Sequence, residues 1–434
     1  MIGQSIGHYR IVVLLALVST GLLLSLPVVG QSNWPQWRGP TRDGAVAVRP
    51  GAHRGAGDWP EQPTLVWKRV VGTGYSGPVA ARDRIWVHAR QVEQEVVRSL
   101  DFSTGKILWV QRYDAPFEQD SSALAHGRGP YSTPTLADDR LLTLGVTAIL
   151  SVWDADSGTL LWRRDYSEEF DPSHMIFGAA ASPLVEGGLC FVHFGDPAIE
   201  DPGSSGSGAM IALRIADGEE VWRWTGDSPA AGATPVIHDR GGLQQLIFKT
   251  RASIVGVDPH AGGELWRMPF RVLEDNTITT PLIIGDRLVT SDYEVGVFAW
   301  RLEAKGGSWT VQELWSNREV SLFMSSPVVV GAQVIGFSHQ RMGQLFGLDL
   351  EDGRVLWLGE RRWGEHATLV VWGDALLVFL EDGSLVVGEV SRKGFQELRR
   401  YRLGEKYSWS HPAIVGDRIL VRSGKKLAVY HLGE

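Results

Sequence analysis

The chain alternates short apolar runs with polar turns, and residues 64–434 nowhere show the 3.6-residue spacing of an amphipathic helix. In residues 133–163, for example, brief apolar runs are separated by turns that contain Asp and Gly. This pattern predicts four short strands joined by three turns. The Asp-x-x-Ser/Thr-Gly step at 154–158 and 101–105 suits a tight turn, because Asp accepts backbone hydrogen bonds and Gly adopts positive φ.

The same unit recurs along the chain, with two markers in step with it. The first marker is a small or hydroxyl residue ahead of Pro. The residue before Pro is Gly77, Thr133, Ser182, Thr234, Thr280, Ser326 or His411, and the seventh unit has the degenerate Thr368-Leu369. These positions are separated by 56, 49, 52, 46, 46, 42 and 43 residues. The second marker is an apolar-Trp pair, whose Trp residues are Trp67, Trp109, Trp162, Trp222, Trp266, Trp315 and Trp357.

The two markers indicate eight units between residues 64 and 434, each of about 46 residues, which is the length of a four-stranded propeller blade. We therefore predict an all-β fold, an eight-bladed β-propeller of four-stranded antiparallel blades. The apolar-Trp pair at 66–67 comes before any unit start, while the last unit stops at 429–431 after its third strand. The N-terminal strand is thus expected to complete the last blade and close the ring.

The combination of Ser/Thr-Pro, Leu-Asp-x-x-Thr-Gly and Leu-Trp resembles the pyrroloquinoline-quinone-type (PQQ-like) propeller repeat, over residues 64–434. This is the superfamily of BamB-like proteins and quinoprotein dehydrogenases. The stretch Trp34–Gly44 within a Trp-rich lead-in, 31–63, is similar to the lead-in of exported bacterial members. In such propellers the repeated Trp docks one blade against the next, and this is the structural role that the resemblance implies for the seven marker Trp residues. The lead-in either recognises a partner or, as we expect, packs along the side or under the base of the propeller.

Residues 1–30 form a separate segment, with Arg10 ahead of an apolar run and small residues at 28–30. This arrangement predicts an export signal, and the alternative is an uncleaved anchor in the inner membrane formed by 11–29. Either interpretation places the protein outside the cytoplasm, in the periplasm or secreted. No Cys lies near this segment, which argues against an acylated anchor.

The net charge of −8 and pI near 5.9 argue against broad nucleic-acid binding through phosphates. The single Cys190 cannot form an intrachain disulfide. Contact with a membrane is expected only through the N-terminal segment, and the propeller is expected to be monomeric.

Quinoprotein dehydrogenases hold PQQ in the mouth of the channel, with a disulfide between adjacent Cys residues, a calcium site and a catalytic Asp. One Cys cannot form that disulfide, and no constellation of residues can be assigned to calcium or to catalysis. We therefore predict a protein without catalytic residues, metal or cofactor. PQQ with calcium remains the alternative.

Three long loops are predicted on one face, at 114–129, 166–178 and 195–208, and form an acidic, partly aromatic sector. Side chains just ahead of the inner strands, Asn276 and Phe323 among them, should converge at the same mouth. The candidate binding residues are Tyr75, His126, Arg128, Tyr131, His174, Phe177, His366, Tyr407 and Trp409. Aromatic rings beside polar groups suit a peptide or small ligand. The alternative is that they fill the channel and pack on one another.

These observations favour an exported, non-catalytic propeller that binds envelope proteins or peptides as a scaffold. The resemblance leaves a PQQ-dependent dehydrogenase, or another small-ligand propeller, as the alternative. Binding or degradation of polysaccharide through the aromatic mouth is a third hypothesis.

Overall fold

The computed structural model describes residues 33–46, 58–119, 126–170, 177–195, 208–227, 232–270, 272, 277–406 and 408–433. The chain divides into two compact units, of which Met1–Gly30 lies outside the described residues and Gln31–Glu434 contains all that follows. The predicted signal or anchor segment therefore lies outside the described part of the chain.

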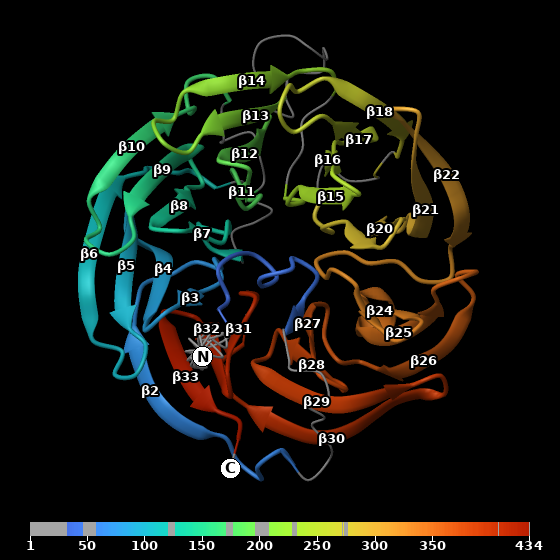
Figure 1. Ribbon diagram of the computed structural model, residues 1–434. Coiled ribbons are helices and arrows are strands. Elements are labelled where there is room, and N and C mark those ends of the chain that lie inside the picture. Colours follow the sequence, from blue (N-terminus) through green and yellow to red (C-terminus); the bar gives the residue numbers. More distant parts are fainter. Residues whose placement is uncertain are drawn as a thin grey trace, which may run out of the picture. The chain divides into compact units, whose positions relative to one another are not determined.

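Eight four-stranded antiparallel sheets follow one another around a ring in unit Gln31–Glu434, as predicted (Figure 1). Blade 1 contains β3 (Val79–Ala81), β4 (Arg84–Gln91), β5 (Gln94–Asp101) and β6 (Ile107–Asp114). Blade 2 contains β7 (Thr135–Ala137), β8 (Arg140–Leu144), β9 (Ile149–Asp154) and β10 (Leu160–Asp165). Blade 3 contains β11 (Leu184–Glu186), β12 (Leu189–Phe194), β13 (Ala209–Arg214) and β14 (Glu220–Trp224). Blade 4 contains β15 (Val236–Arg240), β16 (Leu243–Lys249), β17 (Ser253–Val257) and β18 (Glu264–Pro269).

The second half of the ring continues the same order. Blade 5 contains β19 (Leu282–Ile284), β20 (Arg287–Asp292), β21 (Gly296–Lys305) and β22 (Ser308–Asn317). Blade 6 contains β23 (Val328–Val330), β24 (Gln333–Ser338), β25 (Gln344–Asp349) and β26 (Val355–Arg361), with the 3₁₀ turn η4 (Gln340–Met342) between β24 and β25. Blade 7 contains β27 (Ala367–Trp372), β28 (Ala375–Leu380), β29 (Ser384–Ser391) and β30 (Gly394–Arg402). Blade 8 contains β31 (Ala413–Val415), β32 (Arg418–Ser423), β33 (Lys426–His431) and β2 (Thr64–Val70).

The ring is closed by the N-terminal strand, which confirms the prediction. Strand β2 pairs antiparallel with β33, with Thr64 opposite His431. Arg422 of β32 strengthens this closure, because its buried guanidinium donates hydrogen bonds to the carbonyl oxygens of Ser76, His88 and Thr73 at 2.6–2.8 Å. The last blade is thereby tied to the first by side chain as well as by backbone.

The Ser/Thr-Pro marker forms a belt of hydrogen bonds around the channel. The amide of Thr133 donates to the hydroxyl of Ser182 at 3.0 Å, and the amide of Ser182 donates to that of Thr234 at 3.1 Å. The same bond joins Gly77 to Thr133 at 3.0 Å and Thr280 to Ser326 at 3.2 Å. Each hydroxyl thus satisfies a buried backbone amide of the preceding blade.

Five of the marker Trp side chains contact the next blade. Trp67, Trp109, Trp162, Trp222 and Trp315 donate from Nε1 to the carbonyl oxygens of Phe102, Ala155, Ile215, Pro259 and Leu350, respectively, at 2.7–3.1 Å. Each acceptor follows the first residue of a turn that ends in Gly, and the Trp ring covers that Gly so closely that a methyl group there would lie 2.3–2.7 Å from it. Docking of the Trp ring therefore needs two features of the neighbouring turn, which are a carbonyl oxygen to accept the hydrogen bond and a glycine without a side chain.

Trp266 and Trp357 do not follow this expectation. Their rings cover Gly256 and Gly347 within their own blades, and their Nε1 atoms donate to Gln245 and Gln333. The reason lies in the next blade, since the tight outer hairpins of blades 5 and 7, at 305–308 and 391–394, lack the five-residue turn ending in Gly that accepts the Trp in the other five contacts.

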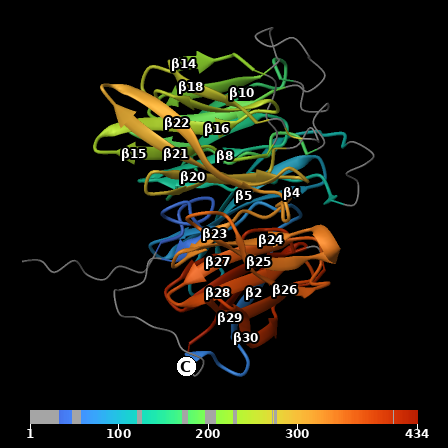
Figure 2. The same ribbon diagram turned by 90° about the vertical axis from the view of Figure 1, so that its right-hand side faces the viewer.

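The lead-in segment 33–46 crosses one end of the channel (Figures 1 and 2). Trp34 exchanges backbone hydrogen bonds with Ala80 of blade 1, at 2.7 and 2.9 Å. Trp37 donates to Thr280 of blade 5 at 3.0 Å, Arg42 to the carbonyl of Val185 in blade 3 at 2.7 Å, and Arg38 to the carbonyl of Pro327 in blade 6. Strand β1 (Ala45–Val46) then pairs in parallel with β27. The segment packs against the propeller as expected, but on the inner strands of several blades rather than along the side.

Candidate functional site

Five of the predicted binding residues meet in one aromatic cluster at the end of the channel away from the lead-in. The ring centroid of Tyr75 lies 5.8 Å from that of Tyr131 and 5.2 Å from that of Trp409. His126 lies 4.2 Å from Trp409 and 5.4 Å from Phe177, which is 5.3 Å from Tyr131. We call these five residues the mouth cluster. All five are half-buried, so their rings pack on one another and still face solvent.

The cluster forms because its members come from segments just ahead of the inner strands. The backbone amides of Tyr75 and Ser76 both donate to the carbonyl of Pro130, at 2.8 and 2.9 Å, which fixes Tyr75 beside Tyr131. The Tyr131 hydroxyl receives a hydrogen bond from Gln119 at 3.1 Å and is held by the backbone of 126–127. Burial raises the pKa of Tyr131 above its usual value, so this hydroxyl remains protonated.

A second aromatic group lies at the same end of the channel, on blades 5 and 6. Tyr293 follows β20, Phe323 precedes the belt of blade 6, and His339 precedes η4. Their ring centroids are 4.8–5.6 Å apart, with Tyr293 stacked on His339. Phe323 was among the residues expected at the mouth. Tyr293 and His339 were not, because they lie in connections that carry neither marker.

Glu365 of blade 7 acts on both aromatic groups. Burial lowers the pKa of His126 and of His339, and the attraction of Glu365 opposes that change at each imidazole. Glu365 and Glu294 are exposed, and Glu294 also acts on His339. The mouth therefore combines half-buried aromatic rings, two imidazoles that are neutral at pH 7, and exposed carboxylates.

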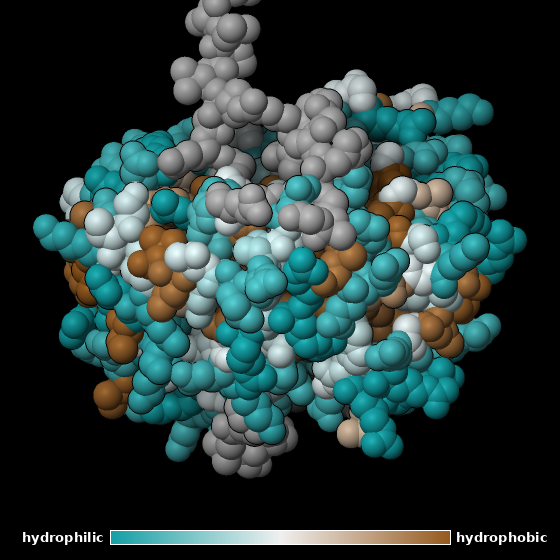
Figure 3. All heavy atoms as spheres, turned by 90° about the horizontal axis from the view of Figure 1, so that it is seen from below, coloured by the Kyte–Doolittle hydropathy of each residue, from teal (hydrophilic) through white to brown (hydrophobic). Residues whose placement is uncertain are grey.

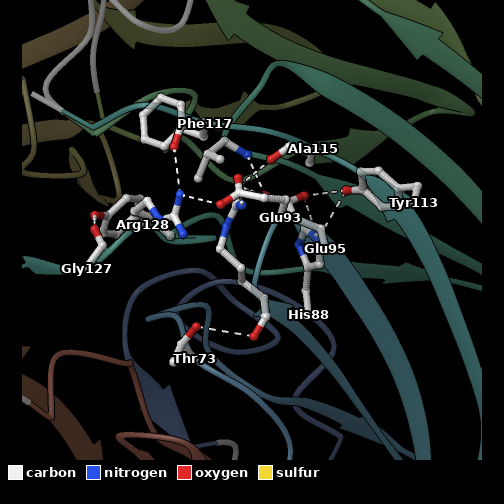
Figure 4. Close-up of polar contacts among 12 residues, drawn as sticks. Thr73, His88, Glu93, Glu95, Tyr113, Ala115, Phe117, Gly127 and Arg128 are labelled. Carbon is white, nitrogen blue, oxygen red and sulfur yellow. Dashed lines mark hydrogen bonds and ion pairs between the residues drawn. The ribbon is translucent and has the colours of Figure 1, made fainter.

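Arg128, which is not one of the five mouth residues, is held by Glu93 of blade 1 (Figure 4). It donates to Glu93 at 2.7 Å and to the carbonyl of Phe117 at 3.3 Å. Beside it, the fully buried Glu95 accepts hydrogen bonds from the Tyr113 hydroxyl at 2.5 Å and the Val146 amide at 3.0 Å.

Glu95 also contacts His88, with 3.0 Å between Oε2 and Nε2. Burial raises the pKa of Glu95, but the attraction of His88 and the hydrogen bonds outweigh this and hold it below its usual value. Glu95 remains an anion whose hydrogen bonds join blades 1 and 2.

The other predicted residues are placed differently or lie outside the description. His366 is buried next to the belt of blade 7, and burial lowers its pKa to about 4. His174, Tyr407 and Asn276 lie outside the described residues, as do 120–125, 171–176 and 196–207 of the three long loops.

A buried ion pair that the sequence reasoning missed joins blades 4 and 5. Lys249 Nζ lies 2.5 Å from Asp292 Oδ2 and also donates to the carbonyl of Ser291 at 2.8 Å. Both side chains are fully buried, which lowers the pKa of Lys249 and raises that of Asp292. Because each is at the end of the second strand of its blade, only the folded ring brings them together.

The described ranges contain no group of three or more His, Cys, Asp or Glu residues placed to hold a metal ion. Within the same ranges, no helix has the length and hydrophobicity needed to cross a membrane.

Comparison with known proteins identifies relatives of most of the ring. Residues 93–358 match the PQQ_2 family, described as "Outer membrane protein assembly factor BamB". The outer membrane protein assembly factor BamB of Shewanella oneidensis is 23% identical over 351 residues, which cover 76% of this chain and 79% of that protein.

Two solved structures share the fold. BamB from Moraxella catarrhalis superimposes with a TM-score of 0.60 at 17% identity, over 85% of this chain and 97% of that one. The quinohemoprotein alcohol dehydrogenase from Comamonas testosteroni superimposes with a TM-score of 0.65 at 14% identity, over 93% of this chain and 81% of that one. At these identities the likeness establishes the fold alone.

Proposed function

Because this chain belongs to the PQQ_2 family, described as outer membrane protein assembly factor BamB, we propose that it is an exported, non-catalytic scaffold of the cell envelope that binds proteins or peptides. The observation that carries the proposal is the mouth cluster, together with the second aromatic group across the same end of the channel. The opposite end is crossed by the lead-in with its half-buried Trp37, whereas the mouth gathers half-buried rings from several blades. Half-exposed rings next to polar groups are typical of binding surfaces for extended peptides.

The chemistry of the mouth favours peptides with aromatic and basic side chains. Aromatic side chains of the peptide would stack on Tyr131 and Trp409. Basic side chains would approach Glu365 and Glu294, because the nearby imidazoles of His126 and His339 are neutral and do not compete. Acidic peptides would be repelled by the same carboxylates.

A fluorescence anisotropy titration tests this proposal. Two dye-labelled peptides with the same aromatic residues, one carrying Lys and the other Glu at alternate positions, are titrated with the chain. We expect the Lys peptide to bind more tightly, and the Trp409→Ala and Tyr131→Ala variants to weaken its binding by at least about tenfold. Phe395→Ala, an aromatic truncation on the outer strand of blade 7, is the matched control and should leave the affinity unchanged. Equal binding by all variants would exclude the mouth as the site.

The envelope location is a separate part of the proposal. Cell fractionation combined with N-terminal sequencing of the purified protein tests it and distinguishes cleavage near Gly30 from a retained anchor. Recovery of the protein in the cytoplasm with Met1 intact would contradict export.

The alternative of a PQQ-dependent dehydrogenase fits these residues poorly. The single Cys190 is buried in β12 and cannot supply a ring of two adjacent cysteines. Lys249 and Asp292, which are charged groups near the mouth, are paired with each other. Calorimetric titration with PQQ and calcium decides the question, and saturable one-to-one binding would favour the alternative over the scaffold.

A further inference from the structure

The outer strands of the eight blades share a bulge, and the residue just before it differs between blades. In every blade the pairing of the outer strand shifts register just before the marker Trp, or before Arg399, which replaces it in blade 7, so that the preceding apolar residue is left out of the pairing. We call the residue two positions before the marker the pre-bulge position. Its side chain stands at the periphery of the ring, where it meets solvent.

In blades 3, 4 and 7 the pre-bulge position is Glu, and it neutralises an Arg three residues later. Glu220 pairs with Arg223 at 2.9 Å, Glu264 with Arg267 at 2.5 Å and Glu397 with Arg400 at 2.6 Å. The outer strands β14, β18 and β30 therefore carry compensated charge. In these three blades, the pre-bulge position therefore holds a carboxylate that pairs with a neighbouring cation.

In blades 8, 1 and 2 the pre-bulge position is instead Leu65, Ile107 or Leu160. These side chains are 49%, 43% and 42% exposed, respectively. The bulged residues next to two of them, Leu108 and Leu161, are 43% and 45% exposed. Three successive blades thus present apolar side chains to solvent where blades 3, 4, 5 and 7 present a carboxylate, and Val355 at this position of blade 6 is half-buried.

The cations on these same strands are not held in ion pairs within the described ranges, although the attraction of Lys68 contributes to lowering the pKa of Glu405. Lys68 and Arg69 of β2, Arg112 of β6 and Arg164 of β10 are all exposed. Within the described parts of the chain none of the four forms an ion pair, and Arg69 and Arg164 donate only to carbonyl oxygens. Asp114 and Asp165 are also exposed on β6 and β10, but basic side chains outnumber acidic ones on the three strands, so a chain of net charge −8 carries a locally basic and apolar outer wall there.

We propose that the outer wall formed by β2, β6 and β10 docks on the surface of an anionic lipid bilayer. Basic side chains bind anionic headgroups, and apolar side chains next to them insert among the headgroups and the upper acyl chains.

A protein partner fits less well, because strong protein interfaces centre on a packed apolar pocket. Here the apolar side chains stand on separate blades, and each can insert by itself. Figure 3, which views the side of the ring that carries β2 and β30, shows hydrophobic residues as separate patches on a mostly hydrophilic surface.

This inference is independent of the proposed function, because the wall and the mouth share no residue. The test uses the unit Gln31–Glu434, whose ring closes without the N-terminal apolar run. Flotation with vesicles of phosphatidylglycerol and phosphatidylcholine is compared with flotation with phosphatidylcholine alone. We expect binding to the anionic vesicles only, weakened by added salt and unaffected by millimolar inorganic phosphate.

Two variants and their matched controls locate the surface. Each basic residue near an anionic membrane is worth about a fivefold change in affinity, so Lys68→Glu with Arg69→Glu should weaken binding by at least about 25-fold. Arg361→Glu with Arg362→Glu makes the same change of charge on blade 6 and should have little effect. Leu108→Ser with Leu161→Ser should also weaken binding, whereas Leu358→Ser, at a residue 39% exposed on β26, should not.

The outcomes are decisive in both directions. Loss of binding in the two wall variants, with the blade 6 variants and Trp409→Ala unchanged, would establish the surface. Absence of binding to anionic vesicles would overturn the proposal, and so would equal losses on blade 6 and on the wall. Binding to an acidic protein but not to vesicles would assign the wall to a different partner and reject the membrane. Circular dichroism of each variant shows that it is folded.

Discussion

The backbone amide of Gly77 in blade 1 donates a 3.0 Å hydrogen bond to the hydroxyl of Thr133 in blade 2, 56 residues later in the chain. That separation is the first of the marker spacings, and the next two hydrogen bonds of the belt span 49 and 52 residues. The spacing of the marker along the sequence is therefore the number of residues between two hydrogen-bonded positions in adjacent blades. A hydroxyl residue is needed there because it accepts from one blade without interrupting its own backbone.

Substitution of Thr133 by Val tests the belt. Val keeps the shape of the side chain but leaves the buried amide of Gly77 without an acceptor, so the free energy of unfolding should fall by about 1–3 kcal/mol. Urea unfolding followed by tryptophan fluorescence measures the change. Thr310→Val at an exposed site of β22 is the control, with an expected change within about 0.5 kcal/mol. Similar values for the two variants would show that the belt adds nothing to stability.

Gly353→Ala tests how closely the marker Trp docks. The added methyl group would lie 2.3 Å from the ring of Trp315, and φ at this residue is +71°. Gly416→Ala is a matched control, because φ is +62° and no atom lies within 4 Å of the new methyl group. The two variants share the backbone strain, so Gly353→Ala should cost about 1–3 kcal/mol more through overpacking alone. Equal costs in thermal or urea unfolding would contradict docking through this contact.

Lys249→Met should be among the most destabilising single substitutions in the ring. It leaves Asp292 buried without its cation, which costs about 3–5 kcal/mol. The double variant Lys249→Met with Asp292→Leu removes both charges and should be more stable than the single variant. A double-mutant cycle by urea unfolding measures the coupling. Additive losses would mean that the two groups stabilise the protein independently.

Acidification should destabilise the propeller through its buried histidines. Burial lowers the pKa of His193 to about 3, of His366 to about 4 and of His411 to about 3. Between pH 6.5 and these values the unfolded chain binds protons that the folded chain does not, so stability is present above pH 6.5 and is lost as the pH falls. Each histidine should lower the free energy of unfolding at pH 5 by about 2 kcal/mol relative to pH 7.

Urea unfolding at a series of pH values measures this effect. In His193→Phe the loss between pH 7 and pH 5 should be smaller by about 2 kcal/mol, because one titrating group is gone. Between pH 7 and pH 8 the variant and the parent should run parallel. An unchanged slope below pH 6.5 would show that His193 titrates normally in the folded state.

The fold could be predicted from the sequence because the contacts between neighbouring blades recur at the same positions in each repeat. The hydroxyl before Pro and the Trp after the bulge each bind the neighbouring unit, so each leaves a periodic mark. The two Trp contacts that depart from this rule could not be predicted from the markers. Trp266 and Trp357 stand at the marker position but contact their own blades, because the difference lies in the turn of the next blade.

The mouth could be predicted only in part for the same reason. Tyr75, Tyr131 and Trp409 lie at a fixed distance ahead of the belt, and their convergence follows from the repeat. Tyr293 and His339 occupy connections of variable sequence, and only the folded ring brings them beside Phe323. Lys249 stands at the same register position as Arg422 of blade 8, and both donate to carbonyl oxygens of the next blade, but Lys249 also meets a carboxylate, Asp292, which the repeat does not predict.

The pairing of β2 with β33 has a consequence for the order of folding. A ribosome makes β2 among the first strands of the ring and β33 last, and Arg422 contacts Thr73 across 349 residues of chain. Blades 1 to 7 each contain four consecutive strands and can form as soon as they are complete, whereas blade 8 cannot exist until the whole polypeptide is available. Release of an incomplete chain would leave β2 as an unpaired strand with an open edge, which is a site for aggregation. Any cell that makes this protein must therefore protect that strand, or hold the chain unfolded, until synthesis ends.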